Sequence, residues 1–213
     1  MAGLKRRIAV LVAAAVLCGL GTTPVHAQQL LQPPRERPDA LMSAVTGEVI
    51  TVLKRDIAAG RATDVARLVE TKIVSLFDFQ RMTSIALGRN WQLASPEQQK
   101  ALVGQFRLLL VRTYSTALSS YRGQEFEFRP LRAASGDTEV VVRSSLRRPG
   151  AESVTIDYDM EDTLAGWKVF DIKIAGVSLV LNYREQFAAA IRSSGIDGLI
   201  KTLSDKNRHN AGA

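Results

Sequence analysis

The spacing of apolar residues changes twice along this chain, and this change restricts the folds that it can adopt. As far as Tyr121, apolar side chains recur every three or four residues, a period typical of amphipathic helices. Between Glu125 and Ala175 they mostly alternate with polar ones, which indicates strands, and after Leu181 helical spacing returns. Helices, then a strand meander, then two short helices predict an α+β fold with helices packed on one face of a curved antiparallel sheet.

Each helix expected before the sheet begins at a residue that can cap it. Asp39 precedes the first helix, and Thr63 and Asp78 precede the second and third. A fourth, longer helix begins at Ser95–Gln98, which combines a capping serine, a proline at the first helical position and a glutamine able to close a capping box. We expect this long helix to end at Gly123.

The strand region contains one regular alternation and one departure from it. In Val154–Glu161 every second residue is apolar, so one face of the sheet is apolar and the other is wet. In Gly166–Ala175 the apolar residues change parity, which predicts either a bulge or a strand covered on both faces. Nearby acidic residues could form a carboxylate site, but the alternation places them on the solvent side. These residues are Asp157, Asp159, Glu161 and Asp162.

The first residues of the chain predict export. Lys5, Arg6 and Arg7 precede an apolar stretch that is shorter than the roughly 20 residues of a spanning helix, and Val25–Ala27 fits a signal-peptidase site. A retained membrane anchor is the alternative. We therefore expect a cleaved signal peptide at 1–27, a flexible leader at 28–38, one folded domain at 39–207 and a polar tail at 208–213.

The composition of the exported part argues against several classes of function. Cleavage leaves 213 − 27 = 186 residues with a charge of +7 − 3 = +4, interspersed with acids, which is a weak signal for nucleic-acid binding. Cys18, the only cysteine, and His26 are lost, so His209 is the one histidine left. The chain also lacks a glycine-rich phosphate loop, a GxSxG elbow and an HExxH motif. The sequence therefore predicts neither an enzyme nor a metal or cofactor site.

Four segments, in this order, resemble the MlaC family of phospholipid-binding proteins, the toluene-tolerance Ttg2 type. The match covers nearly all of the expected mature chain, and the third segment is the longest and most specific. The segments are FDFQRMTSIALGRNW (77–91), SPEQQKALVGQFRLLLVRTY (95–114), GWKVFDIKIAGVSLVLNYREQF (166–187) and GIDGLIKTL (195–203).

The resemblance implies a fold like the nuclear-transport-factor cone, with an apolar cavity that holds acyl chains. It implies a monomeric periplasmic carrier without catalysis, which moves phospholipid between the membranes of a Gram-negative envelope and maintains outer-membrane lipid asymmetry. Phospholipid would be its cargo. Its implied partners are an outer-membrane lipoprotein and porin complex and an inner-membrane MCE-domain protein attached to an ABC transporter.

Within such a fold we expect the meander, the long helix and the segment after the last long strand to line the cavity, some of these residues being ordinary core. The expected lining residues are Phe106, Leu110, Tyr114, Val142, Ile156, Tyr158, Val169, Ile172, Val177, Leu179 and Val180. At the rim, Tyr183 offers an amphipathic tip and Arg184 a cation for a lipid phosphate. Alternatively, Arg184 begins a helix and bonds a nearby carboxylate.

Two other functions remain open at this point. An enzyme on the same cone-shaped fold would need acids or bases inside the cavity, and the expected lining contains tyrosines but no carboxylate or histidine. A pure interaction module would use the helical N-terminal third to bind an envelope protein, and its cavity would be a filled core.

Overall fold

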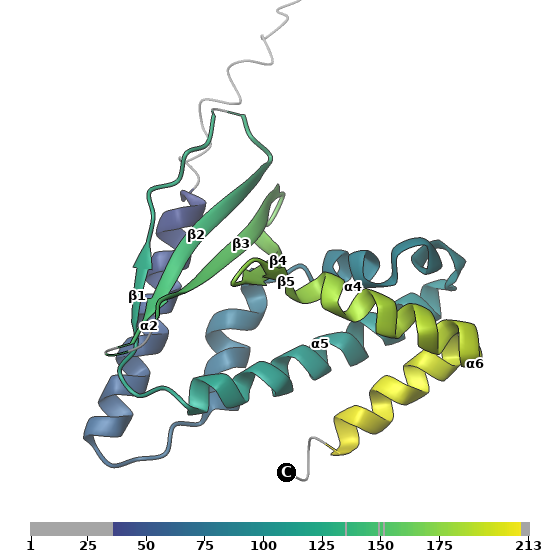
Figure 1. Ribbon diagram of the computed structural model, residues 1–213, viewed down its shortest axis with the longest axis horizontal. Helices are drawn as coiled ribbons and strands as arrows, with labels where there is room; N and C mark the ends of the chain where they lie inside the picture. The colour runs from purple at the N-terminus through teal and green to yellow at the C-terminus, as the bar shows by residue number, and fades with distance from the viewer. Residues whose placement is uncertain (1–35, 135, 149, 151, 210–213) are drawn as a thin grey trace, which may run out of the picture. The chain divides into compact units, whose positions relative to one another are not determined.

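The computed structural model describes residues 36–134, 136–148, 150 and 152–209 (Figure 1). The predicted signal peptide, the start of the predicted leader and the last four residues lie outside this part of the chain. Helix α2 (Pro38–Ala58) comes first, and helix α5 (Pro96–Ser119) and the kinked helix α6 (Leu179–His209) are the longest elements. None of the helices in the described residues is long and apolar enough to cross a membrane.

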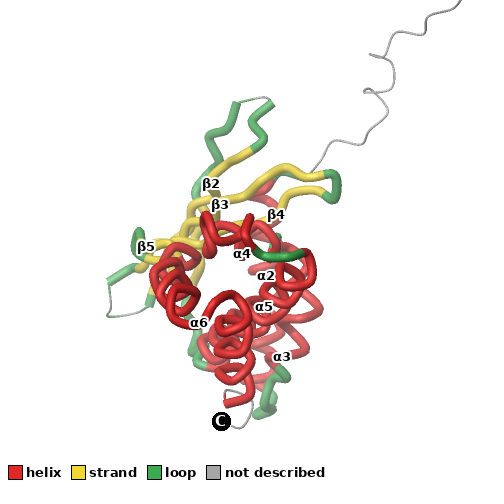
Figure 2. The backbone as a smooth tube through the Cα atoms, turned by 90° about the vertical axis from the view of Figure 1, so that its right-hand side faces the viewer, coloured by secondary structure: helices red, strands yellow, loops and turns green. Residues whose placement is uncertain are grey.

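The five strands form one antiparallel sheet in the order β1-β2-β3-β4-β5, so the predicted meander and the α+β fold are confirmed. The strands are β1 (Glu125–Phe128), β2 (Glu139–Arg147), β3 (Val154–Thr163), β4 (Gly166–Ile174) and β5 (Val177–Ser178). Figure 2 shows the helices gathered below the strands. This arrangement follows from the alternation in the strands, because an apolar sheet face must be covered.

A bulge in β4 explains why its apolar residues change parity. Asp159 pairs with Asp171, but the next residue of β3, Met160, pairs with Val169, so Phe170 has no partner in the register. One extra residue reverses the facing of every side chain beyond it. The bulge is thus the correct one of the two explanations that the sequence allowed.

The segment between α2 and α5 is less regular than its apolar period predicts. The sequence predicts a single helix here, but the structure has three short elements: α3 (Val65–Leu68), a π-helix η1 (Val69–Ile73) and a 3-10 turn η2 (Val74–Leu76). The predicted cap at Thr63 is wrong: the Asp64 side chain accepts from the Arg67 N–H at 3.0 Å, and the Thr63 hydroxyl donates to Asp56 instead. Helix α4 (Phe79–Leu87) and the 3-10 turn η3 (Gly88–Leu93) follow.

The predicted cap at Asp39 is also wrong, because α2 begins at Pro38 and Asp39 lies inside its first turn; the N-cap residue is Arg37, and its side chain makes no capping hydrogen bond. The signals at Asp78 and Ser95 act as predicted. The Asp78 side chain caps α4 by accepting from the Arg81 N–H at 2.8 Å. At the start of α5, the Gln98 N–H donates to the Ser95 hydroxyl at 3.2 Å and the Ser95 N–H donates to the Gln98 side chain at 3.0 Å, which completes the capping box. Helix α5 ends at Ser119, four residues before the expected glycine.

The C-terminal helix changes direction at Gly195, where φ is 71° and ψ is −177° (Figure 1). This backbone region is accessible essentially to glycine alone, so the residue separates two helices that run on as one element. The two predicted C-terminal helices are therefore present, although the first begins at Leu179, earlier than the sequence indicated.

One polar cluster joins the sheet to α4. The guanidinium of Arg81 pairs with Glu139 on β2 at 2.6 Å and with Glu161 on β3, and it lies 3.6 Å from the centre of the Phe170 ring. The Arg81 side chain is only 28 % exposed, so these contacts are partly shielded from water. They join the first turn of α4 to β2 and β3.

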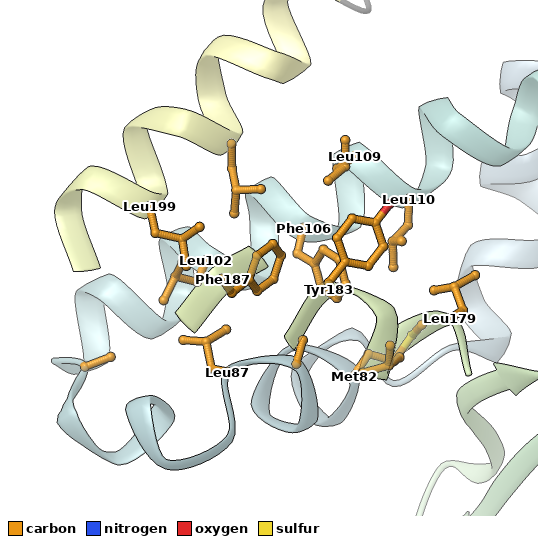
Figure 3. Close-up of a cluster of buried hydrophobic side chains, with 14 residues drawn as sticks. Met82, Leu87, Leu102, Phe106, Leu109, Leu110, Leu179, Tyr183, Phe187 and Leu199 are labelled. Carbon is orange, nitrogen blue, oxygen red and sulfur yellow. The ribbon is translucent and has the colours of Figure 1, made fainter. Parts of the chain in front are cut away.

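Hydrophobic side chains form three clusters. The largest lies between α4, α5 and α6 (Figure 3) and includes Phe106 and Phe187, whose ring centres are 5.2 Å apart. The second lies on the sheet beneath the start of α2 and contains Met42 and Val142. The third joins α2 to the end of α5 through Leu53 and Tyr121.

Candidate binding cavity

A cavity of about 290 Å³ lies between α2, the η1–η2 segment, α5 and the sheet. Val45, Val49 and Leu53 line it from α2, and their spacing of four residues puts them on one helix face. Leu110, Val111, Tyr114, Ser115 and Leu118 line it from α5, and Ile156, Tyr158, Ile172 and Ile174 from the sheet. The remaining lining residues are Met42, Thr46, Ile50, Val69, Ile73, Val74, Leu76, Phe77, Phe79, Met82, Tyr121, Phe126 and Leu179.

No charged side chain is among the described residues that line this cavity. Its polar groups are hydroxyls, carried by Thr46, Tyr114, Ser115, Tyr121 and Tyr158. An isolated charge inside such a wall would lose its hydration without gaining a partner, whereas an alkyl chain would gain from leaving water. The cavity is therefore suited to hydrocarbon, and its volume is near the lower end of the roughly 300–1,000 Å³ typical of ligand pockets.

The tyrosines of the wall are neutral, and burial makes them harder to ionise. It raises the pKa of Tyr158 to about 12 and also raises the pKa of Tyr114. The pKa of Tyr121 is raised by burial and, to a smaller extent, by the negative charge of Glu125. The cavity thus presents uncharged hydroxyls, which can donate or accept a hydrogen bond but are poorly suited to act as bases at neutral pH.

Six of the residues expected to line a cavity are on its wall: Leu110, Tyr114, Ile156, Tyr158, Ile172 and Leu179. Four others are fully buried but lie in the surrounding core. Phe106 and Val180 pack in the cluster between α4, α5 and α6, and Val142 and Val169 pack in the cluster beneath α2. Val177 lies outside the cavity and is 63 % exposed, because the short strand β5 is at the edge of the sheet.

The two residues expected at a rim have other surroundings. Tyr183 is 8 % exposed, and its ring packs edge-on against Phe106 with the centres 5.1 Å apart (Figure 3). The Arg184 guanidinium donates to the carbonyl oxygen of Ile85 at 2.8 and 3.2 Å. Because this carbonyl is in the last turn of α4, the cation also meets the negative end of that helix. The partner of Arg184 is thus a carbonyl and not a carboxylate.

Sequence reasoning missed the part of the wall that α2 and the η1–η2 segment contribute. The apolar face of α2 was visible in the period of its residues, but no local signal shows which sheet face a helix will cover. The positions of Val69, Ile73 and Val74 on the wall were harder still to predict, because a π-helix turns its side chains to other directions than a regular α-helix does.

The acidic residues of β3 have the partners that a wet sheet face provides. Lys173 pairs with Asp159 at 2.7 Å, and Arg81 pairs with Glu161. No group of three or more histidine, cysteine, aspartate or glutamate side chains in the described residues is placed to hold a metal ion.

Comparison with known proteins adds three findings. A family model described as MlaC protein matches residues 43–205. The toluene tolerance protein ttg2D of Pseudomonas putida is 30 % identical over 110 residues, which are 52 % of this chain, so the chain spans about half the length (50 %) of that relative. The solved structure of a phospholipid-binding protein from Ralstonia solanacearum, in complex with a phospholipid, is 40 % identical with a TM-score of 0.73. That match covers 83 % of this chain and 99 % of the other.

Proposed function

This chain belongs to the MlaC protein family, and on that premise we propose that it is a phospholipid carrier of the periplasm. The acyl chains occupy the cavity between α2, α5 and the sheet, and the phosphate and headgroup remain outside it. The family and the phospholipid-bound relative support lipid binding and indicate a binding protein and not a catalyst. The predicted export signal supports the location.

The observation that carries this proposal is the uncharged wall of the cavity, in a fold shared with a relative solved in complex with a phospholipid. Moving hydrocarbon out of water is worth about 0.8 kcal/mol per methylene, so exposing one ~15-carbon chain would cost on the order of 12 kcal/mol. A carrier that crosses an aqueous compartment must supply a substitute for the bilayer.

The partners of the transfer are part of the same proposal. We place the protein between an outer-membrane lipoprotein and porin complex and an inner-membrane MCE-domain protein of an ABC transporter, in the maintenance of outer-membrane lipid asymmetry. What supports these partners is membership of the family alone. A pull-down with each candidate partner, using lipid-loaded and lipid-depleted protein, tests them.

Native mass spectrometry tests lipid binding directly. The protein is purified from the periplasm of its host without detergent, and any bound lipid is identified after organic extraction. We expect near-stoichiometric phospholipid and its transfer to acceptor vesicles. Protein that repeatedly carries no lipid, and takes none up from vesicles, would refute the carrier function and favour an interaction module with a filled core.

A further inference from the structure

Two hydroxyls in the wall of the cavity have no partner. Tyr121 is 6 % exposed, and its phenolic oxygen is buried without a hydrogen-bond partner among the described residues. The same is true of the Ser115 hydroxyl on α5. Both residues line the cavity, whose wall is otherwise almost entirely apolar.

The neighbouring hydroxyls of α5 show that Ser115 is unusual. Those of Thr116 and Ser119, and that of Ser120 directly after the helix, each donate to the carbonyl four residues earlier, at 3.5, 3.2 and 3.2 Å. Serine and threonine commonly form this bond when they lie inside a helix. Ser115 instead lines the cavity with its hydroxyl unpaired.

A buried hydroxyl without a partner is costly, because it loses its bonds to water and gains nothing in exchange. A ligand that brings a hydrogen-bond acceptor into the cavity removes this cost. Phosphate oxygens are poor candidates, because burying their negative charge in a wall without a cation is costly. An uncharged carbonyl oxygen is a suitable acceptor for a neutral hydroxyl.

The position of Tyr121 fits the glycerol end of a lipid. The residue follows the end of α5, and Arg122 and Gly123, which come next, are exposed. Glu125, whose charge acts on the Tyr121 hydroxyl, is exposed as well. The buried hydroxyl is therefore close to the protein surface. The ester carbonyls of a phospholipid lie between its buried chains and its solvated headgroup.

We propose that the hydroxyls of Tyr121 and Ser115 donate hydrogen bonds to the acyl-ester carbonyl oxygens of the bound lipid. This inference rests on the proposed carrier function and extends it to lipid selection. The protein distinguishes ester-linked from ether-linked phospholipids, because an ether linkage has the same shape along the chain but no carbonyl oxygen.

The test compares two synthetic phospholipids that have the same headgroup and chain length, one a diester and the other a diether. Each is titrated against the protein, and the bound fraction is measured by native mass spectrometry. We expect the diester to bind roughly tenfold more tightly, which is the scale of one buried hydrogen bond gained by a group otherwise unpaired. Tyr121→Phe should reduce this preference to within about threefold, and Ser115→Ala should reduce it partly.

Ser119→Ala is the matched control, since its hydroxyl bonds within its own helix, and it should keep the full preference. Tyr121→Phe removes an unpaired polar atom, so the lipid-free variant should unfold at the same temperature as the parent or a higher one.

The outcomes separate this inference from the function on which it rests. Equal binding of diester and diether lipid by the unmodified protein would overturn the carbonyl contacts and leave the carrier intact. A full preference retained by folded Tyr121→Phe and Ser115→Ala variants would overturn the assignment to these residues. Failure to bind either lipid would refute the carrier function itself.

Discussion

Replacing Val111 with tryptophan should fill part of the cavity without disturbing the helix that carries it. Val111 lines the cavity from the middle of α5. Valine and tryptophan have similar helix propensities, so the substitution changes the side chain within the cavity and not the stability of the helix. The lipid and the indole ring would then compete for the same space.

The size of the effect follows from the hydrocarbon displaced. Tryptophan has ~7 more side-chain heavy atoms than valine, and if each displaces one methylene of the lipid at ~0.8 kcal/mol, the upper limit is about 5–6 kcal/mol. Part of the chain can bend into remaining space, so we expect roughly half of this, about 3 kcal/mol, which corresponds to an about hundredfold weaker affinity.

The assay is a titration with phospholipids of graded chain length, read by native mass spectrometry. We expect Val111→Trp to lose affinity most strongly for long chains and to prefer chains several carbons shorter than the parent does. Thr113→Trp is the control, because Thr113 is on the same helix but exposed. The thermal midpoint of both variants, measured without lipid, should remain within a few degrees of the parent's because the new ring enters existing space.

The reasoning would be refuted if folded Val111→Trp bound long-chain phospholipid as tightly as the parent and with the same chain-length preference. Such a result would mean that the acyl chains do not occupy this cavity. The reasoning would also be refuted if Thr113→Trp lost as much affinity as Val111→Trp, because a tryptophan outside the cavity would then have the same effect as one inside it.

Three further predictions concern stability. Arg81→Met should lower the free energy of unfolding by about 2 kcal/mol, because it leaves two glutamates unpaired, and should lower the thermal midpoint by about 4–8 °C in calorimetry. A hydrogen bond from Arg37 holds the pKa of Asp39 below its ordinary value of 3.8, so this carboxylate stabilises the fold above that pH and the contribution disappears as the pH falls through the lowered pKa. Asp39→Asn should therefore be less stable than the parent to urea at pH 7, and this deficit should shrink as the pH is lowered towards 2; an equal deficit at both pH values would contradict this. Gly195→Ala should lower the free energy of unfolding by about 1–3 kcal/mol, measured in urea, because the residue has a positive φ. Gly104→Ala should raise it by about 0.5–1 kcal/mol, because this glycine lies inside α5 with free space around it.

Local signals allowed much of the fold to be predicted from the sequence. The capping box at Ser95 and Gln98, the cap at Asp78 and the change of parity in β4 all depend on residues within a few positions of one another. Thr63 shows the limit of such signals, because it had a neighbour, Asp64, equally able to cap. The resemblance to the MlaC family added what the period of apolar residues could not, and the family model confirmed it.

The wall of the cavity could be predicted only in part. Phe106 and Leu110 are one turn apart on α5 and both are buried, yet only Leu110 lines the cavity, because α6 packs Tyr183 and Phe187 against Phe106. Likewise Val142 and Tyr158 are cross-strand partners, and only Tyr158 lines the cavity.

The sequence by itself determined which segments become helices or strands, where some of them begin and which of their faces are apolar, because these properties depend on neighbouring residues. Only the tertiary structure decided which side chains pack in the core and which, such as Tyr121, line the cavity. That choice depends on contacts between segments far apart in the chain. Helix α2 leaves part of the sheet uncovered where the cavity lies, whereas α6 packs against α5 around Phe106 and buries it in the core. A cavity forms where the helices and the sheet do not pack against one another, and no local pattern of residues predicts where that happens.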